Sequence, residues 1–248
     1  MESKRLNKFI SDSGFCSRRE ADKLIEQGRV KLNGKPPELG TKVTEDDSVC
    51  VDGKPINRVK ADKSDRVYIA YNKPAGITCT TERKVSGNIV DAIGFKQRIF
   101  PIGRLDKPSE GLILLTSDGD IVNKILRAEN AHEKLYRVNV DKAINERFVK
   151  RMSAGVPILN TVTKPCTVVA RGQKSFDIVL TQGLNRQIRR MCEYLGYEVT
   201  SLVRKRIMHL TLKGLNRGEW RHLTDSELSE LNAAVATSTK VAAHNDAE

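Results

Sequence analysis

The spacing of apolar and polar residues indicates that the chain begins with a small separate module. Apolar residues recur at helical spacing twice within its first part, once on either side of a Ser-Gly break. Ser17 and Glu20 have the spacing of a capping box, in which each side chain binds a free amide of the first helical turn. Asn33-Gly34 and Asp52-Gly53 are turn signals between short apolar runs. We therefore predict two helices followed by a small sheet over residues 1–62.

A different pattern begins at Val67, after the polar segment 57–66, which is typical of a linker. Short apolar runs predict strands at 67–71, 112–116, 135–140, 176–181 and 207–212. Helical stripes intervene near residues 121–126, 148–152 and 188–195, and Thr224 begins a last helix through Leu231. This mixture predicts an α+β domain over 67–235, built on a mainly antiparallel mixed sheet flanked by helices. The tail, 236–248, lacks any apolar period, and we expect it to be disordered.

The charge of the chain indicates an anionic partner. Its 43 Lys and Arg outnumber its 31 Asp and Glu, for a net charge of +12. A balance of this kind favours nucleic acid or an anionic membrane as a partner. No segment approaches the roughly 20 apolar residues of a membrane span, and no helix pairs a basic face with large interfacial aromatic residues. We therefore expect a nucleic-acid partner and no membrane association.

Cysteine usage and the missing motifs restrict the class further. The five cysteines are scattered and never spaced Cys-x-x-Cys, which favours free thiols in a reducing cytoplasm. The four histidines form no ligand-like pair, so no metal is expected. Neither a P-loop nor a Gly-x-Gly-x-x-Gly motif occurs, so we expect no nucleotide cofactor.

Two groups of basic residues are candidates for phosphate contact. Arg18, Arg19 and Lys23 lie on the first turns of the second predicted helix, where the helix N-terminus also favours an anion. A solvated helix face explains this group equally well. A second group falls within two segments of the larger domain, and phosphate contact explains it better than a plain surface cluster does. Its members are Arg186, Arg189, Arg190, Arg204, Lys205 and Arg206.

Asp106 is the residue most suited to chemistry. It stands in a glycine-bracketed turn, Gly103 to Gly111, just before the apolar run of a buried strand. Such an Asp can simply stabilise the turn, or it can serve as a nucleophile or base held rigidly at the edge of a sheet. Tyr136 is likewise either a core residue or a platform for a displaced base. An Arg on the helix near 188 is either surface charge or the partner of a buried carboxylate.

Taken together, these segments resemble the pseudouridine synthases that modify ribosomal RNA. Residues 4–55 resemble an S4 RNA-binding domain. The segment 103–116, Gly-Arg-Leu-Asp-Lys-Pro-Ser-Glu-Gly-Leu-Ile-Leu-Leu-Thr, matches the catalytic signature of this family without a gap. Residues 72–76, 134–136 and 185–191 match its other motifs. The resemblance is strongest to the RsuA-like branch, and within it to the RluF type.

The resemblance implies a reaction and roles for five residues. Asp106 would be the essential carboxylate for cleavage of the uridine glycosidic bond, after which the base rotates and rejoins through carbon. Tyr136 would pack against the flipped base and Arg189 would pair with Asp106. Arg104 would fill the space left by the base, and Leu202 would line the pocket. No metal or organic cofactor is implied.

The resemblance also implies the partners. The expected substrate is a uridine of large-subunit ribosomal RNA, with a tRNA anticodon-loop uridine as a second substrate, and the expected enzyme is a monomer. Arg186 and Arg190 join the N-terminal cations as expected RNA contacts. The alternative is an RNA-binding ribosome-assembly factor that uses the same scaffold without catalysis. An intact Asp106 with its partners distinguishes the enzyme from this alternative.

Overall fold

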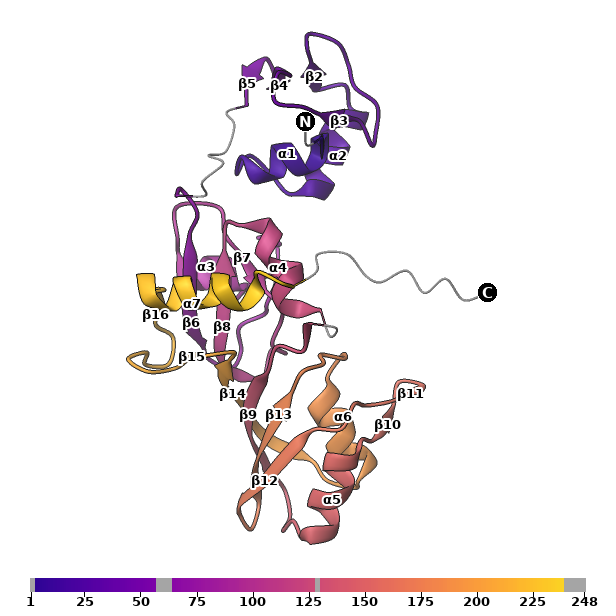
Figure 1. Ribbon diagram of the computed structural model, residues 1–248, viewed down its shortest axis with the longest axis vertical. Helices are drawn as coiled ribbons and strands as arrows, with labels where there is room; N and C mark the ends of the chain where they lie inside the picture. The colour runs from indigo at the N-terminus through magenta and orange to yellow at the C-terminus, as the bar shows by residue number, and fades with distance from the viewer. Residues whose placement is uncertain (1–2, 57–63, 128–129, 239–248) are drawn as a thin grey trace. The chain divides into compact units, whose positions relative to one another are not determined.

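The computed structural model describes residues 3–56, 64–127 and 130–238. The chain forms two compact units (Figure 1), Met1–Arg66 with Lys96–Arg98, and Val67–Phe95 with Ile99–Glu248. The domain boundaries predicted above remain a prediction. Most of the predicted linker and residues 239–248 of the predicted disordered tail lie outside the described residues.

The first unit has the predicted two helices and small sheet. Ser17 caps the second helix, because its hydroxyl accepts the Glu20 amide at 3.1 Å. The reciprocal bond from the Ser17 amide to the Glu20 side chain, which a full capping box requires, does not form between these two described residues. Apolar residues of both helices pack against the strands in one core. The elements are β1 (Lys4–Arg5), α1 (Leu6–Asp12), α2 (Arg18–Glu26), β2 (Val30–Leu32), β3 (Lys42–Val43), β4 (Val49–Val51) and β5 (Lys54–Pro55).

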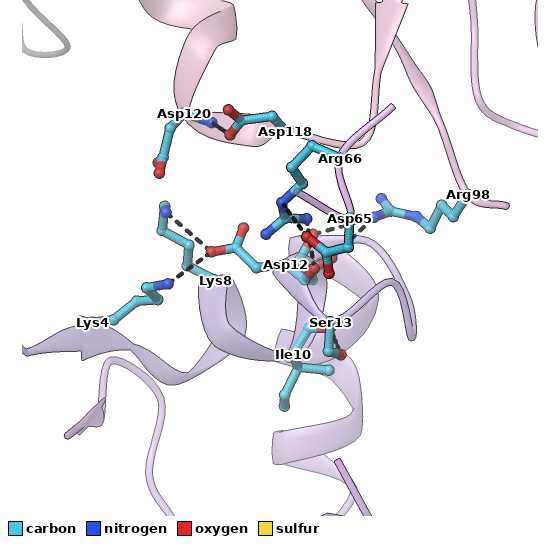
Figure 2. A network of polar contacts seen from close by, with 11 residues as sticks. Lys4, Lys8, Ile10, Asp12, Ser13, Asp65, Arg66, Arg98, Asp118 and Asp120 are labelled. Atoms are coloured by element: carbon cyan, nitrogen blue, oxygen red, sulfur yellow. Dashed lines mark hydrogen bonds and ion pairs between the residues drawn. The ribbon is translucent and has the colours of Figure 1, made fainter. Parts of the chain in front are cut away.

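Both predicted turns form, but they connect different partners. Asp52 and Gly53 adopt φ values of 50° and 75° and join β4 to β5 as a tight hairpin. Asn33 and Gly34 also turn the chain, with φ values of 50° and 80°, yet β2 pairs with β4 further along the chain. Figure 2 shows a third feature of this unit, the ammonium groups of Lys4 and Lys8, each 3.1 Å from the Asp12 carboxylate at the end of α1.

The second unit is built on one large mixed sheet in the order β12-β13-β9-β14-β8-β6-β16 (Figure 1), with β7 and β15 attached at β8 and β14. β14 and β8 run parallel, and the other pairs described in this sheet are antiparallel. Its strands are β6 (Tyr68–Lys73), β7 (Phe100–Ile102), β8 (Glu110–Thr116), β9 (Lys134–Val140), β12 (Thr167–Gly172), β13 (Ser175–Leu180), β14 (Val199–Ile207), β15 (Leu210–Thr211) and β16 (Trp220–His222).

The strand predicted at 207–212 is wrong. β14 already ends at Ile207, the chain reverses through Met208 with φ of 53°, and β15 pairs back onto β14. The long strand Val199–Ile207 was not predicted, because three consecutive basic residues at its end hide the alternation of buried and exposed positions. This strand forms the parallel pair with β8.

Helices cover both faces of the sheet. α4 (Gly119–Leu126) and α7 (Asp225–Val235) pack over one face of β6 and β8, and α7 crosses these strands in Figure 1. α3 (Ile89–Ile93) packs on the other face. α5 (Glu146–Ala154) and α6 (Gln187–Tyr194) cover the half made of β9, β13 and β14. A short hairpin, β10 (Pro157–Ile158) with β11 (Thr161–Val162), follows α5. Among the described residues no helix is long and apolar enough to cross a membrane.

We expect acid to weaken the attachment of α7 through Glu227. The predicted start at Thr224 is confirmed as a full capping box. Hydrogen bonds from Arg221, together with the amide of Thr224, lower the pKa of Glu227 from 4.5 to about 2. Since the carboxylate form is favoured in the folded state, this stabilisation is complete above pH 4.5 and is lost as pH falls towards 2.

The measurement is thermal melting of wild type and Glu227→Gln from pH 7 to pH 3. The wild type should be more stable by about 1 kcal/mol at pH 7, because water screens this partly exposed pair, and the difference should shrink below pH 4.5. Glu193→Gln, at an exposed position on α6, is the control and should show no comparable pH-dependent difference. A constant difference for Glu227→Gln across the range would contradict the assignment.

Candidate active site

Asp106 lies in the loop that leads into β8. The turn is closed by the Ser109 amide, which donates to the Asp106 carbonyl at 2.9 Å. The Asp106 side chain is 29% exposed, so its carboxylate remains accessible to a substrate. Two guanidinium groups flank the same oxygen, Oδ2, with Arg186 Nη1 at 3.6 Å and Arg189 Nε at 3.7 Å. The structure thus places one accessible acid beside two cations from α6 and the residue before it.

Arg189 is fixed by two further contacts. Its Nη2 donates to the buried Ser109 hydroxyl at 3.1 Å, and its Nη1 donates to the Val199 carbonyl at the start of β14 at 3.3 Å. Burial and the neighbouring charge of Arg186 lower the pKa of Arg189, and Asp106 partly offsets them. The guanidinium therefore joins the acid loop, α6 and β14 at one point.

The loop before α6 places Arg186. Arg186 itself adopts φ of 50°, a conformation uncommon for a residue other than glycine. Gln187 is buried and closes the loop, since its Oε1 accepts the Leu184 amide at 3.0 Å. An exposed arginine held in this backbone conformation points to a functional constraint on the turn.

Lys73 is a site residue that the sequence reasoning missed. The side chain is 0% exposed at the end of β6. Its ammonium donates to the carbonyls of Pro74 at 2.8 Å, Ile77 at 2.9 Å and Lys107 at 3.4 Å. Burial lowers the pKa of Lys73. Lys73 thus ties the loop after β6 to the residue that follows Asp106, and its place in the family motif at 72–76 was the only signal for it.

A row of paired residues crosses the sheet beneath the acid loop. Lys73 pairs with Gly111, Gly111 with Arg204, Arg204 with Tyr136, and Tyr136 with Ile178. Directly paired residues project to the same face of a sheet. Tyr136 is half-buried and packs against the apolar clusters on both sides of it, below α6 and below α3. The base platform expected from the resemblance therefore stands mid-sheet, on the face that α6 covers.

Gly111 allows β8 and β14 to approach closely. It adopts φ of 102°, and a Cβ added there would overlap the Arg204 carbonyl and lie 2.7 Å from the Arg204 nitrogen. Leu202, two residues before Arg204 on β14, pairs with Val138. It is 6% exposed and belongs to the core under α6. Leu202 thus lies on the same face as Tyr136.

The other predicted RNA contacts divide into different environments. Arg104 is exposed in the acid loop. Arg190 folds back onto Asn185, with hydrogen bonds of 3.1 and 3.3 Å. The three predicted RNA contacts of the first unit all lie exposed on α2 and enter no ion pair with another described residue: Arg18, Arg19 and Lys23.

The single phosphate-binding cluster predicted for residues 186–206 is wrong in part. Arg204 is 4% exposed, too buried for contact with a backbone phosphate. Arg206 is held by the Glu133 carboxylate at 2.8 Å and the Met208 carbonyl at 2.6 Å. Along β14 buried and exposed positions alternate, and sequence proximity does not reveal that this alternation buries Arg204. A cavity of about 410 Å³ is lined by residues 157–162 of the β10–β11 hairpin, which include none of the predicted site residues.

Comparison with known proteins agrees with this geometry. Residues 67–194 match the RNA pseudouridylate synthase family, and residues 4–49 match the S4 domain. The chain belongs to the RNA pseudouridylate synthase family. It is therefore an RNA pseudouridine synthase, an enzyme that isomerises uridine to pseudouridine in RNA, which decides against the non-catalytic interpretation.

Individual relatives show where the chain stands within this family. It is 59% identical to the dual-specificity RNA pseudouridine synthase RluF of Salmonella typhi, over 92% of this chain and 78% of the relative. The Escherichia coli K12 protein of the same name is 57% identical, over 96% and 81%. The ribosomal large subunit pseudouridine synthase B of Bacillus subtilis is 35% identical, over 92% and 96%.

A solved structure supports the fold over the same extent. A crystal structure of a pseudouridylate synthase superposes with a TM-score of 0.66 at 27% identity, covering 92% of this chain and 99% of the other. The resemblance to the RsuA-like branch and the RluF type is confirmed, as is the predicted fold class of an S4 domain with a mixed α+β catalytic domain.

Proposed function

We propose that this synthase modifies a uridine of large-subunit ribosomal RNA and, as a second substrate, a uridine in a tRNA anticodon loop. The names of its relatives support two points, a ribosomal large-subunit target and dual specificity. The net charge of +12 suits a polyanionic RNA. The observation that carries the proposal is the accessible Asp106 carboxylate beside Arg186 and Arg189.

The proposed roles follow from this arrangement. Asp106 acts on the ribose or the base as the glycosidic bond breaks, and Arg189 holds its carboxylate towards the substrate. A uridine in a stem or stacked loop must leave the stack before that bond is reachable. Tyr136 receives the flipped base, Leu202 lines its pocket, and the exposed Arg104 occupies the space that it leaves. Arg186 and Arg190 contact the flanking phosphates.

The test of the substrate is a map of pseudouridines in ribosomal RNA and tRNA from cells with and without this protein. One large-subunit site and one tRNA site should be lost, and a plasmid copy of the wild type should restore both. If the large-subunit map is unchanged, the ribosomal assignment is wrong. If the tRNA map alone is unchanged, only the second substrate is excluded.

The S4 unit is proposed to supply binding rather than chemistry. Replacing Arg18, Arg19 and Lys23 together by Glu should weaken binding of a folded ribosomal RNA fragment at least ~100-fold. The slope of log affinity against log salt concentration should fall by the amount expected for about three phosphate contacts. Turnover of a saturating short stem-loop should stay within about threefold. Filter binding across a salt series and single-turnover rates measure the two effects.

The matched control replaces by Glu three exposed lysines elsewhere in the same unit, Lys31, Lys35 and Lys54. Equal losses from both triple variants would mean that only the overall charge matters, and the assignment to α2 would then fail.

We also propose a monomer working in the cytoplasm. The five cysteines are free thiols, as a reducing compartment favours. Light scattering at enzyme concentrations used for turnover measures the mass directly, and the value expected is that of one 27.7 kDa chain.

A further inference from the structure

Arg204 is a buried cation that forms no ion pair with an acid in the described ranges. The residue is 4% exposed in the middle of β14, and its Nε donates to the Leu112 carbonyl at 2.6 Å. Within the described part of the chain, its Nη2 has no hydrogen-bond partner and the side chain forms no ion pair. Burying an unpaired charge is costly. A role in holding β8 explains the Nε contact, but a neutral side chain that also donates a hydrogen bond, such as glutamine, would serve that role without burying a charge.

The guanidinium lies against Tyr136. Its Cζ is 5.9 Å from the centroid of the Tyr136 ring, within the range of a cation–π contact. The two residues are direct neighbours across β9 and β14, so the register of the sheet fixes this contact. Tyr136 is half-buried, which leaves part of the ring free to meet a base.

Two more buried cations surround Arg204. Lys73 and Lys134 are 0% and 6% exposed. Burial lowers the pKa of both, to about 8 for Lys134, and the positive charge of Arg204 acts in the same direction. At Lys73 the nearby Cys79, Glu110 and Asp106 partly offset this lowering. Positive charges gathered in a poorly solvated region raise the local potential, which favours an anion placed beside them. Lys73, one end of this row, also donates to the carbonyl of Lys107, the residue that follows the accessible acid Asp106.

We propose that Arg204 is a positioning residue that supports Tyr136 from the buried side and stabilises the negative charge that develops on the base packed against the ring. The proposal rests on the proposed roles of Asp106 and Tyr136. It adds an electrostatic function to a residue that touches neither the RNA backbone nor the catalytic carboxylate.

The base carries this negative charge during only part of the reaction. When the C1′–N1 bond breaks, its electron pair remains with the base, which becomes a uracil anion. The base turns, a ring electron pair of C5 forms the new C1′–C5 bond, the C5 proton leaves and N1 gains a proton. Atoms and electrons balance without a co-reactant. A fixed cation therefore lowers the barrier more than it stabilises the bound uridine.

The test compares Arg204→Gln, Arg204→Met and Arg204→Lys in the full-length enzyme. Single-turnover loss of the target nucleoside is measured on a stem-loop that carries either uridine or 5-fluorouridine, whose more acidic base leaves more readily as an anion. With uridine, the Gln and Met variants should react about 10- to 100-fold more slowly, while Lys stays within about fivefold of wild type. With 5-fluorouridine the Gln and Met losses should fall below about fivefold. RNA affinity should change less than threefold throughout.

Control variants distinguish the loss of the Arg204 charge from a loss of folding and from a failure of the proposed site. Arg151→Met removes an exposed cation on α5 and should react as wild type does. Thermal melting identifies any variant that does not fold. If Arg204→Met does not fold, the comparison of Arg204→Lys with Arg204→Gln tests the proposal. Equal losses for Lys and Gln, equal losses on both substrates, or no loss would each overturn the proposal. Asp106→Asn is assayed in parallel, and its full activity would count against the proposed site rather than against Arg204.

Discussion

Asp106→Asn should abolish pseudouridine formation and leave RNA binding intact. The substitution keeps the size of the side chain and removes its charge, so the two neighbouring guanidinium groups lose the carboxylate that they face. A neutral amide cannot act as nucleophile or base, and we expect the single-turnover rate to fall at least ~1,000-fold. Liquid chromatography of nucleosides from a digested stem-loop measures the product, and filter binding measures affinity.

The control for this prediction is Asp141→Asn. Asp141 is an exposed acid whose Oδ1 accepts the Glu198 amide at 2.8 Å, in the turn after β9. This variant should lose less than about threefold in rate, although it removes the same charge from the same domain. Persistent product formation by Asp106→Asn, at a rate near that of Asp141→Asn, would show that the carboxylate is not essential.

Gly111→Ala should be among the most destabilising single changes in the catalytic domain. The new methyl group would overlap the backbone of Arg204, and φ of 102° is unfavourable for any residue with a Cβ. Neither strand can move away freely, because β8 and β14 lie in the centre of the sheet. We expect a loss of more than ~4 kcal/mol, seen as a drop in melting temperature of at least ~10 °C or as insoluble protein.

Gly214→Ala separates the clash from the backbone conformation. Gly214 also has a positive φ, 71°, but no atom lies within 4 Å of an added Cβ. Its cost should be about 1 kcal/mol, or about 2–4 °C in melting temperature. Similar losses at both glycines would contradict the close approach of β8 and β14.

Local sequence pattern was sufficient where short-range physics decides the structure. The caps at Ser17 and Thr224 and the turns at Asn33 and Asp52 depend on residues a few positions apart, and the structure shows all four. Asp106 was found for a similar reason, since its turn and the apolar strand after it are contiguous.

The rest of the site depends on contacts between distant segments. Arg189 meets Asp106 because β14 pairs in parallel with β8, and the mixed polarity of β14 gave no sign of that strand. The partner role of Arg189 came from family resemblance alone. Lys73 was missed and Arg204 was wrongly expected to contact phosphate, because lysine and arginine are usually exposed. Only the sheet register shows that both are buried in one row.

The parallel pair of β8 and β14 also means that the site is complete only when two distant parts of the catalytic domain are both present. The acid loop precedes β8, whereas α6 and β14 emerge some 80 residues later. A nascent chain released or stalled before Ile207 would carry its carboxylate without the strand that brings the guanidinium groups to it. We therefore expect fragments that end before Ile207 to be inactive even where they contain Asp106.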